Sequence, residues 1–339
     1  MRQKPKMYKD RIDLYKELEA DRQSKLIVYM TGDRRGLETQ IHPEVLDLFL
    51  EHLDLIGIVD KISLVLYTRG GITTAAYGIV NLIRQFCKNF EVIVPAKCHS
   101  AGTLICLGAN SILMTKQATL GPIDPSISGS LNPQIAGEHP KARAPVSVEA
   151  ISGYLDFVRN VARIKKSADL ATILVNLADK VHPIVLGDVY RIRSQIRMLG
   201  ERLLHGQIQD KSKSKKILNF LCSESGSHDY TIHRREARDS LGLAIAKPND
   251  SQYKLIKKIY DDLANELELR NPFDPLVLLG GNNTCSYGLR RGLLESLAGG
   301  SHYFASGGTI TKKAIQVAPN QIQEIVEDNR TFEGWKHEK

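Results

Sequence analysis

The first part of the chain alternates between short apolar runs rich in β-branched residues and segments whose apolar residues recur at helical spacing. A continuous apolar run that ends at a turn residue predicts a buried strand, and recurrence every three or four positions predicts a helix. Strands are predicted at 24–32, 61–71, 90–96 and 111–115, and helices at 43–57, 73–86 and 101–109. This alternation predicts an α/β fold of right-handed βαβ units around a largely parallel sheet.

Beyond Ser130 the pattern changes. A loop rich in Gly, Pro and Ser precedes three predicted helices, and a polar, basic connector at 205–216 follows them. The Gly-Gly pairs near the end predict short strands joined by turns. The predicted divisions are an N-terminal helix at 1–24, a core at 25–205, a helical and helix-turn-helix-like segment at 206–270, and a mixed C-terminal segment at 271–339.

The composition fits an ordinary globular protein, with 339 residues, 42% hydrophobic and 25% charged. Its five cysteines form no CxxC pair, which indicates reduced, buried thiols and a cytoplasmic location. No apolar stretch reaches the ~18 residues of a membrane span. Neither a phosphate-binding glycine loop nor a metal-ligand cluster occurs, so no cofactor and no metal is predicted.

Ser100 lies where the third predicted strand gives way to a short helix. A serine hydroxyl becomes an effective nucleophile when a base takes its proton and N–H donors stabilise the oxyanion. Small residues after Ser100 allow a tight turn in which the Ala101 N–H is exposed, and Gly70 and Gly71 end the neighbouring strand. Ser is also a preferred helix N-cap and a Gly-Gly pair also makes a plain turn, so both interpretations stay open at this point.

Four motifs follow one another within residues 25–245. They are Thr68-Arg69-Gly70-Gly71, Ser100-Ala101-Gly102-Thr103, Leu120-Gly121-Pro122-Ile123-Asp124-Pro125-Ser126-Ile127 and Ser227-His228-Asp229-Tyr230-Thr231-Ile232. In this order they resemble the serine dehydrogenase proteinase family, relatives of signal peptide peptidase A within the Clp protease/crotonase-like superfamily. The resemblance implies a Clp protease/crotonase-like core with helical and C-terminal appendages. It also implies serine peptidase activity, with Ser100 as nucleophile and an oxyanion hole formed by Gly70, Gly71 and Ala101.

The general base is less well defined by the motifs. The Clp protease uses a His shortly after the nucleophile, but 120–124 holds none, and Arg159 occupies the helix where some relatives carry a Lys base. Arg stays protonated and cannot act as a base. His228, oriented by Asp124 or Asp229, completes an admissible Ser–His–Asp set. The alternatives are Lys116, Lys165 and His99, whose side chain is expected to diverge from that of Ser100, and Asp124 also fits a turn-forming residue between two prolines.

Two other functions compete with a peptidase acting on peptide or protein substrates. One is a catalytically inactive scaffold of the same fold. The other is a nucleic-acid-associated protein that uses the basic 191–238 region, with Arg234 and Arg235 contacting phosphates, although a solvated basic surface explains that region more simply. A homo-oligomer is also expected, because such folds commonly assemble and the helix after Ser100 would offer an apolar outer face.

Overall fold

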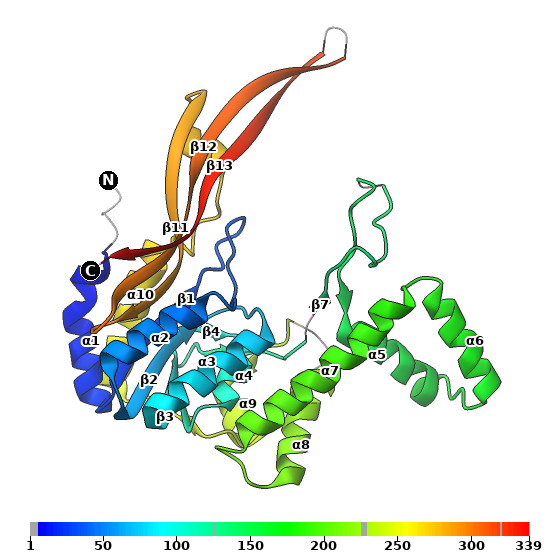
Figure 1. Cartoon of the computed structure of the whole chain (residues 1–339), viewed down its shortest axis with the longest axis horizontal. Coiled ribbons are helices and arrows are strands. Elements are labelled where there is room, and N and C mark those ends of the chain that lie inside the picture. The colour runs from blue at the N-terminus through cyan, green and yellow to red at the C-terminus, as the bar shows by residue number, and fades with distance from the viewer. Residues whose placement is uncertain (1–5, 125, 138, 225–228, 319–320, 339) are drawn as a thin grey trace.

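An eight-stranded mixed sheet runs through the protein in the order β10-β5-β3-β2-β1-β11-β12-β13, as seen in the computed structural model (Figure 1). The structure describes residues 6–124, 126–137, 139–224, 229–318 and 321–338. The strands of this sheet are β1 (Lys25–Thr31), β2 (Val59–Tyr67), β3 (Cys87–Val94), β5 (Ser111–Met114), β10 (Ile245–Ala246), β11 (Thr284–Ser296), β12 (Gly300–Ala318) and β13 (Gln321–Glu338). The helices are α1 (Tyr8–Arg22), α2 (Val45–Ile56), α3 (Thr73–Phe86), α4 (Ala101–Leu107), α5 (Val148–Asp156), α6 (Ser167–Ala178), α7 (Pro183–Leu204), α8 (Lys211–Asn219), α9 (Arg234–Asp239), α10 (Asp250–Glu266) and α11 (Pro275–Leu279). Two π-helical turns, η1 (Phe157–Val161) and η2 (Phe220–Glu224), follow α5 and α8.

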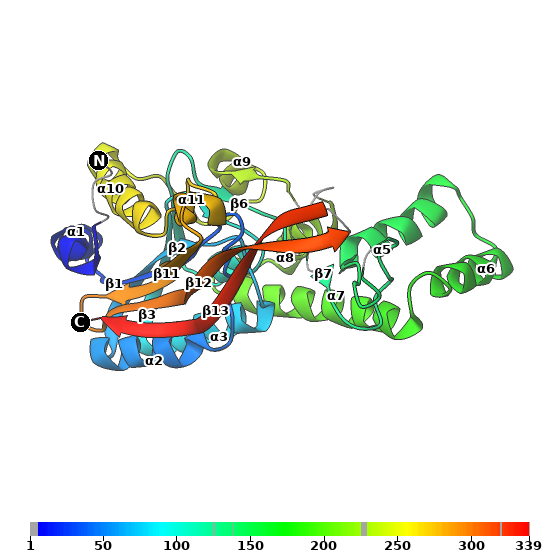
Figure 2. The same cartoon turned by 90° about the horizontal axis from the view of Figure 1, so that it is seen from above.

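The central strands β10, β5, β3, β2 and β1 are all parallel, which confirms the predicted α/β fold. Their residues are apolar without interruption because helices cover both faces of the sheet. Along β1, Ile27 and Tyr29 join one hydrophobic cluster with α2, α3 and α4, whereas Val28 and Met30 join another with α1 and α10. Figure 2 shows these two helical layers on opposite sides of the sheet. The parallel strands therefore present all their carboxyl ends at one rim.

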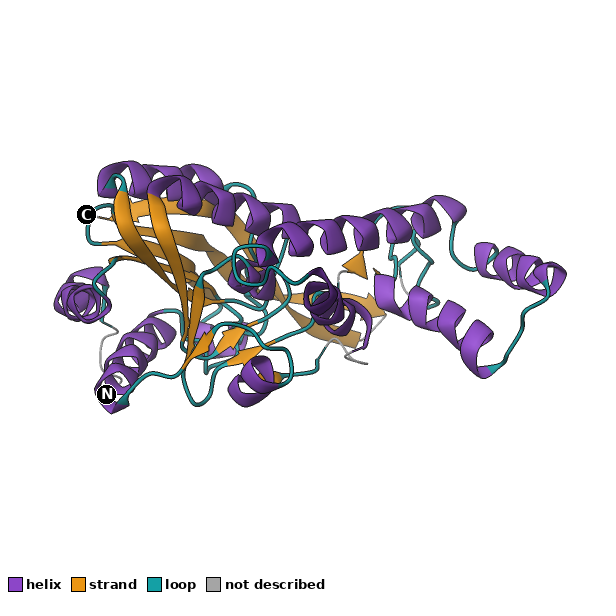
Figure 3. Ribbon diagram, turned by 90° about the horizontal axis from the view of Figure 1, so that it is seen from below, coloured by secondary structure: helices purple, strands orange, loops and turns teal. Residues whose placement is uncertain are grey.

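The segment from α5 to the first half of α7 projects away from the sheet as an arm (Figures 1 and 3). Only a small valine-rich cluster holds it together, and α6 has no buried residue. Large apolar side chains are exposed along the arm, namely Tyr154, Phe157, Val161, Leu174, Val175, Ile184 and Tyr190. We refer to these seven residues as the arm patch.

The helix after Ser100 does not offer the apolar outer face that the sequence led us to expect. All seven residues of α4 are buried, and α4 packs against α3 and α7 within one molecule. The apolar sequence of this helix therefore reflects its place in the core. Exposed apolar surface lies on the arm patch instead.

The C-terminal strands are long, and the prediction of short strands joined by turns was wrong. β11, β12 and β13 have 13, 19 and 18 residues and form an antiparallel ribbon that extends the central sheet through β1. Gly280–Gly281 and Gly299–Gly300 do lie at turns, but Gly307 and Gly308 lie within β12, where the register shifts between them. Glycines inside strands commonly accompany such bulges. Since β11 pairs with β1, the sheet joins 271–339 to 25–205; the proposed domain division remains a prediction.

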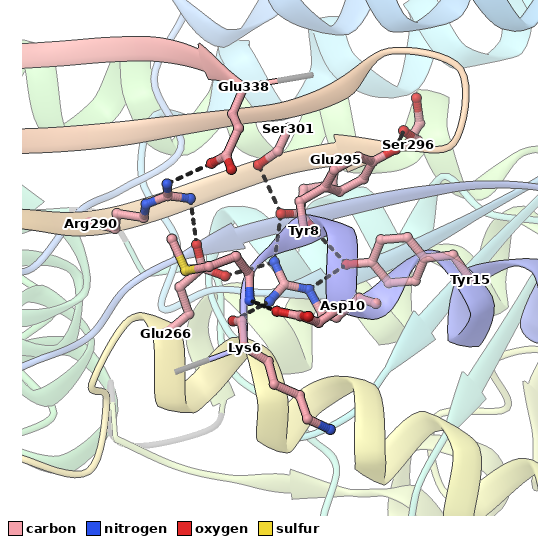
Figure 4. A network of polar contacts seen from close by, with 12 residues as sticks. Lys6, Tyr8, Asp10, Tyr15, Glu266, Arg290, Glu295, Ser296, Ser301 and Glu338 are labelled. Carbon is pink, nitrogen blue, oxygen red and sulfur yellow. Dashed lines mark hydrogen bonds and ion pairs between the residues drawn. The ribbon is translucent and has the colours of Figure 1, made fainter. Parts of the chain in front are cut away.

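A buried ionic cluster ties this ribbon to α1 and α10 (Figure 4). One Arg11 nitrogen lies 2.7 Å from carboxylate oxygens of both Glu266 and Glu295. Tyr15 and Ser301 donate hydrogen bonds to Glu295, and Arg290 bridges Glu266 to Glu338. We refer to Arg11, Tyr15, Glu266, Arg290, Glu295, Ser301 and Glu338 as the Arg11 cluster.

Candidate active site

A small three-stranded sheet brings three distant segments to the rim where the parallel strands end. It consists of β4 (Lys97–Cys98), β6 (Thr119–Leu120) and β9 (Ile232–His233), with β4 parallel to β6 and β9 antiparallel to it. Cys98 pairs with Leu120, which pairs with Ile232. Because β9 runs in the opposite direction, the residues after Cys98, after Leu120 and before Ile232 emerge at the same end. Ser100 lies at this end.

Ser100 occupies a strained turn between β4 and α4. Its φ of 52° and ψ of −116° are unusual for a residue with a side chain. The turn is tight because Gly102 packs closely on the preceding strands, where a Cβ would lie 2.4 Å from Thr68 Cγ2 and 2.9 Å from Cys98 Sγ. Ser100 itself is only half-buried. A strained strand-to-helix turn that leaves a serine accessible is typical of hydrolase nucleophiles.

Two backbone N–H groups lie unused beside this serine. In the described parts of the chain, neither Gly71 nor Ala101 donates a backbone hydrogen bond. The Gly70 N–H, in contrast, donates to Thr68 Oγ1 at 2.9 Å. A Cβ on Gly70 would lie 2.7 Å from Ser100 Cβ and 3.1 Å from Ser100 Oγ, so the absence of a side chain at Gly70 lets the two loops pack closely together. Each of these two loops therefore carries one N–H group, that of Gly71 or that of Ala101, without a partner among the described residues.

The Gly70–Gly71 loop is fixed by the segment before α2. Ile41 N–H donates to Gly70 O at 2.9 Å, and Ile72 N–H donates to Ile41 O at 2.8 Å. Gly71 has a φ of 144°, and a Cβ there would lie 2.4 Å from Ile41 O. No residue with a side chain fits this position without displacing the loop, which explains the second glycine of the pair.

A pocket of about 280 Å³ opens over Ser100. Its lining residues are Arg69, Lys97, His99, Ser100, Pro122 and Asp229. Lys97 Nζ lies 2.6 Å from the Asp33 carboxylate, which also accepts a hydrogen bond from Tyr67. A cleft of this kind, with a few convergent polar groups, suits a small part of a larger substrate.

Of the predicted base, His228, and its predicted partner, Asp124, only Asp124 lies among the described residues. His228 lies outside the described residues, although Asp229, the next residue, lines the pocket with Ser100. Asp124 does not line the pocket. It lies near Ser147, whose hydroxyl is 3.5 Å from both carboxylate oxygens, and it contributes to a raised pKa of Glu149 that is caused mainly by burial.

The alternative bases lie in other surroundings. Lys116 Nζ lies 4.4 Å from the centre of the Tyr253 ring on α10, and Lys165 is exposed on the arm. His99 lines the pocket, but its Nε2 is 2.9 Å from Thr119 Oγ1, and its ring packs against Gly121.

Cys98, two residues before the serine, is fully buried, and burial raises the pKa of its thiol well above the usual range. Its sulfur lies 3.6 Å from Cys106 Sγ. A neutral, inaccessible thiol is inert, so of the Cys98 and Ser100 side chains only that of Ser100 is accessible.

The basic residues considered for nucleic-acid binding are partly used within the fold. Arg234 donates to Met114 O at 3.2 Å, and Arg238 pairs with the neighbouring Asp239. The helix that carries them, α9, has six residues. Across the described ranges, no group of three or more His, Cys, Asp or Glu could hold a metal ion.

Residues 55–147 match a protein family described as ClpP-like SDH-type serine proteinase. This part of the chain is similar to that family. The matched segment contains the Gly70–Gly71 loop, Ser100 and Asp124, so the similarity and the geometry of the loops coincide at one site.

Two curated relatives come from Methanocaldococcus jannaschii. They are the uncharacterized proteins MJ0137 and MJ1495, which are 30% and 27% identical to the chain over 187 residues. The alignments cover 54% of this chain and 53% and 51% of the relatives. The chain therefore spans about half the length of the curated relatives it matches.

Two of the solved structures with partial similarity are the following. A variant of the 1510-N membrane-bound stomatin-specific protease has 17% sequence identity and a TM-score of 0.39, covering 70% of this chain and 85% of its own. ClpP1 from Listeria monocytogenes has 16% identity and a TM-score of 0.36, covering 72% of this chain and 98% of its own.

None of the described helices is by itself long and apolar enough to span a membrane. The pair α6 and α7, bent by 105°, passes together on length and composition alone.

Proposed function

We propose that this protein is a serine peptidase that hydrolyses peptide bonds through an acyl-enzyme on Ser100. The observation that carries the proposal is a pair of N–H groups that donate no hydrogen bond within the described residues, that of Ala101 next to the strained, accessible serine and that of Gly71 next to the glycine packed against it. Buried donors normally have partners, and an enzyme that binds an oxyanion keeps two of them vacant until substrate arrives. The similarity of residues 55–147 to a serine proteinase family supports the same conclusion.

In the proposed reaction, Ser100 Oγ attacks the carbonyl carbon of the scissile bond. Gly71 and Ala101 donate to the carbonyl oxygen as it becomes an oxyanion, while Gly70 provides the space for this approach. The base accepts the Ser100 proton and delivers it to the leaving amine, and water then hydrolyses the ester by the same steps. Since Gly70 already donates to Thr68, it is assigned no donor role in this scheme.

His228 is the proposed base, with Asp124 as its orienting partner. Neighbours of both residues line the pocket and support this choice. Pro122 precedes Asp124 by two residues, and Asp229 directly follows His228. The lysine in the pocket is a poorer candidate, since its Nζ already lies 2.6 Å from the Asp33 carboxylate. Asp229 could also orient the imidazole.

We also propose that the enzyme acts as a homo-oligomer. The arm patch supports this, because exposed apolar surface often marks an interaction site, and the arm exposes seven large apolar side chains. Size-exclusion chromatography with light scattering tests it, with Val175→Asp on α6 expected to shift the protein toward the monomer.

Labelling with a fluorophosphonate tests the proposed activity. The wild type is expected to acquire one phosphonate on Ser100, located by peptide mass spectrometry, and to hydrolyse a denatured protein substrate. Ser100→Ala should lose both, and His228→Gln should slow hydrolysis by at least about 100-fold, as expected when a general base is removed. His205→Gln, at an exposed histidine after α7, is the matched control and should keep full activity. Labelling that persists in Ser100→Ala would contradict the proposal.

A further inference from the structure

Arg69 is a cation on the exposed side of the Ser100 pocket. It belongs to the first of the four motifs, which assigned it no role. Thr68 and Cys98 form a parallel bridge, and both side chains are fully buried. Since side chains alternate along extended backbone, Arg69 and its neighbours Lys97 and His99 lie on the opposite, outward side. All three line the pocket.

Arg69, Lys97 and Asp229 are the charged residues that line the pocket. Lys97 is paired with Asp33 at 2.6 Å, and Asp229 has an interaction of its own. Arg69 is exposed, and within the described residues it forms no ion pair. Its guanidinium, which has five N–H donors and no acceptor, is therefore available to meet an anion at this pocket.

The position of Arg69 indicates where on the substrate this anion would lie relative to the bond that is cleaved. Arg69 precedes Gly70 and Gly71, and Gly71 is the donor assigned to the substrate carbonyl. Successive residues of an extended peptide lie about 3.3 Å apart, so the residues flanking the bond held at Ser100 lie within reach of a long side chain at this position. The pocket, of about 280 Å³, has room for one such side chain but not for a large fragment.

We propose, on the basis of the peptidase function above, that the site selects peptides with a carboxylate next to the scissile bond and that Arg69 determines this specificity. Arg forms paired hydrogen bonds with the planar carboxylate group, which makes the interaction both charged and directional. Two sources offer this chemistry. The carboxylate is either the side chain of an Asp or Glu flanking the bond, or the free C-terminus of a peptide cleaved near its end.

The test uses the full-length enzyme and a set of otherwise identical fluorogenic peptides. Each carries Glu, Gln or Lys in turn on either side of the cleaved bond, and each is made with a free and an amidated C-terminus. Charged hydrogen bonds contribute enough that kcat/KM should favour the carboxylate about 10- to 100-fold over its amide. Loss of the preference on amidation identifies the C-terminus as the source, and its persistence identifies the side chain.

Variants of Arg69 assign the preference to this residue. Arg69→Glu should reverse it in favour of Lys, and Arg69→Lys should restore preference for the carboxylate at reduced strength. Arg191→Glu, at an exposed arginine on α7, makes the same charge change away from the pocket and should leave the preference unchanged. A preference that reverses cannot result from a merely structural defect.

Fluorophosphonate labelling of Ser100 separates failure of this inference from failure of the proposed function. Where a peptide is hydrolysed too slowly to measure, its affinity is obtained from the concentration at which it protects Ser100 from labelling. Normal labelling with equal kcat/KM or equal protection for Glu, Gln and Lys peptides overturns the role of Arg69 alone. Absence of Ser100 labelling overturns the peptidase, and with it this specificity.

Discussion

The Ser100 loops and the Arg11 cluster treat polar groups in opposite ways. In the Arg11 cluster, buried charges face one another, with Arg11 against Glu266 and Glu295 at 2.7 Å and Arg290 bridging two carboxylates (Figure 4). At the Ser100 loops, two backbone N–H groups have no partner among the described residues, and the serine backbone is strained. The first arrangement is what a stable fold requires. The second is what a binding site for an oxyanion requires, and the function we propose therefore lies at Ser100.

Breaking the Arg11 cluster should have the largest effect on stability. Glu295→Gln leaves Arg11 buried beside a neutral amide, and removing one partner of a buried ion pair costs about 3–5 kcal/mol of unfolding free energy. Urea unfolding measures this loss. Lys88→Gln removes an exposed ion pair with Asp60 and should change stability by less than about 0.5 kcal/mol. A loss below 1 kcal/mol in Glu295→Gln would show that the cluster is not the structural tie assumed here.

Changing Gly71 should reduce activity without comparable unfolding. In Gly71→Ala the new Cβ meets Ile41 O at 2.4 Å, so the N–H moves away from its position beside Ser100. Loss of one oxyanion donor lowers the rate by about 100- to 1000-fold, which a hydrolysis or labelling assay detects. Gly57→Ala is the matched control, because Gly57 also has a positive φ, 74°, but nothing lies within 4 Å of its Cβ. Equal activity in the two variants would refute the donor role of Gly71.

Acidification should destabilise the protein through histidines packed between α2 and the ribbon. Burial, with His302 and His337 nearby, lowers the pKa of His52 to about 3, and burial also lowers the pKa of His302. His52 Nε2 lies 2.9 Å from His302 Nδ1, His302 stacks on His337, and Glu51 lies 3.4 Å from His302 Nε2.

The unfolded chain binds protons at these histidines below their ordinary pKa of about 6.5, whereas the folded His52 does not until about pH 3. The stability contributed by the neutral form is therefore complete above pH 6.5 and declines as the pH falls toward 3. The slope is at most about 1.4 kcal/mol per pH unit for His52. His52→Gln should flatten this slope in urea unfolding between pH 7 and pH 4, and an unchanged slope would rule out the contribution. The pKa of Glu91 is also lowered, so Glu91 also makes the protein less stable as the pH falls. This contribution is the same in the wild type and in His52→Gln and cancels when their slopes are compared.

Relief of strain at Ser100 should give the smallest effect. Glycine adopts a φ of 52° without the penalty that a side chain incurs, so Ser100→Gly should be more stable than Ser100→Ala by about 1 kcal/mol. Both variants should be inactive. Thermal unfolding measures the difference, and an Ala variant as stable as the Gly variant would show that the turn stores no strain.

Much of the parallel core could be predicted from the sequence because its signals are local. Continuous apolar runs identify strands covered on both faces, and the turn residues after them identify the rim where Ser100 and Gly71 meet. The long C-terminal strands could not be predicted, because Gly307 and Gly308 look like turn residues until pairing with β13 shows them within a strand.

Long-range contacts also limited what could be predicted of the site. Arg69 and Lys97 face Ser100 only because Thr68 pairs with Cys98, and Lys97 is neutralised by Asp33, 64 residues earlier. Asp229 reaches the pocket through the pairing of β6 with β9. The role of His228, the oligomeric state and the cytoplasmic location stay predictions.

A crystal structure of the phosphonate adduct would test most directly whether Ser100, Gly71 and Ala101 enclose one carbonyl-sized space. We expect phosphorus bonded to Ser100 Oγ and one phosphoryl oxygen about 2.7–3.1 Å from both amide nitrogens, the range expected for oxyanion donors. A phosphoryl oxygen turned toward solvent, or either N–H bonded elsewhere in the adduct, would contradict this expectation.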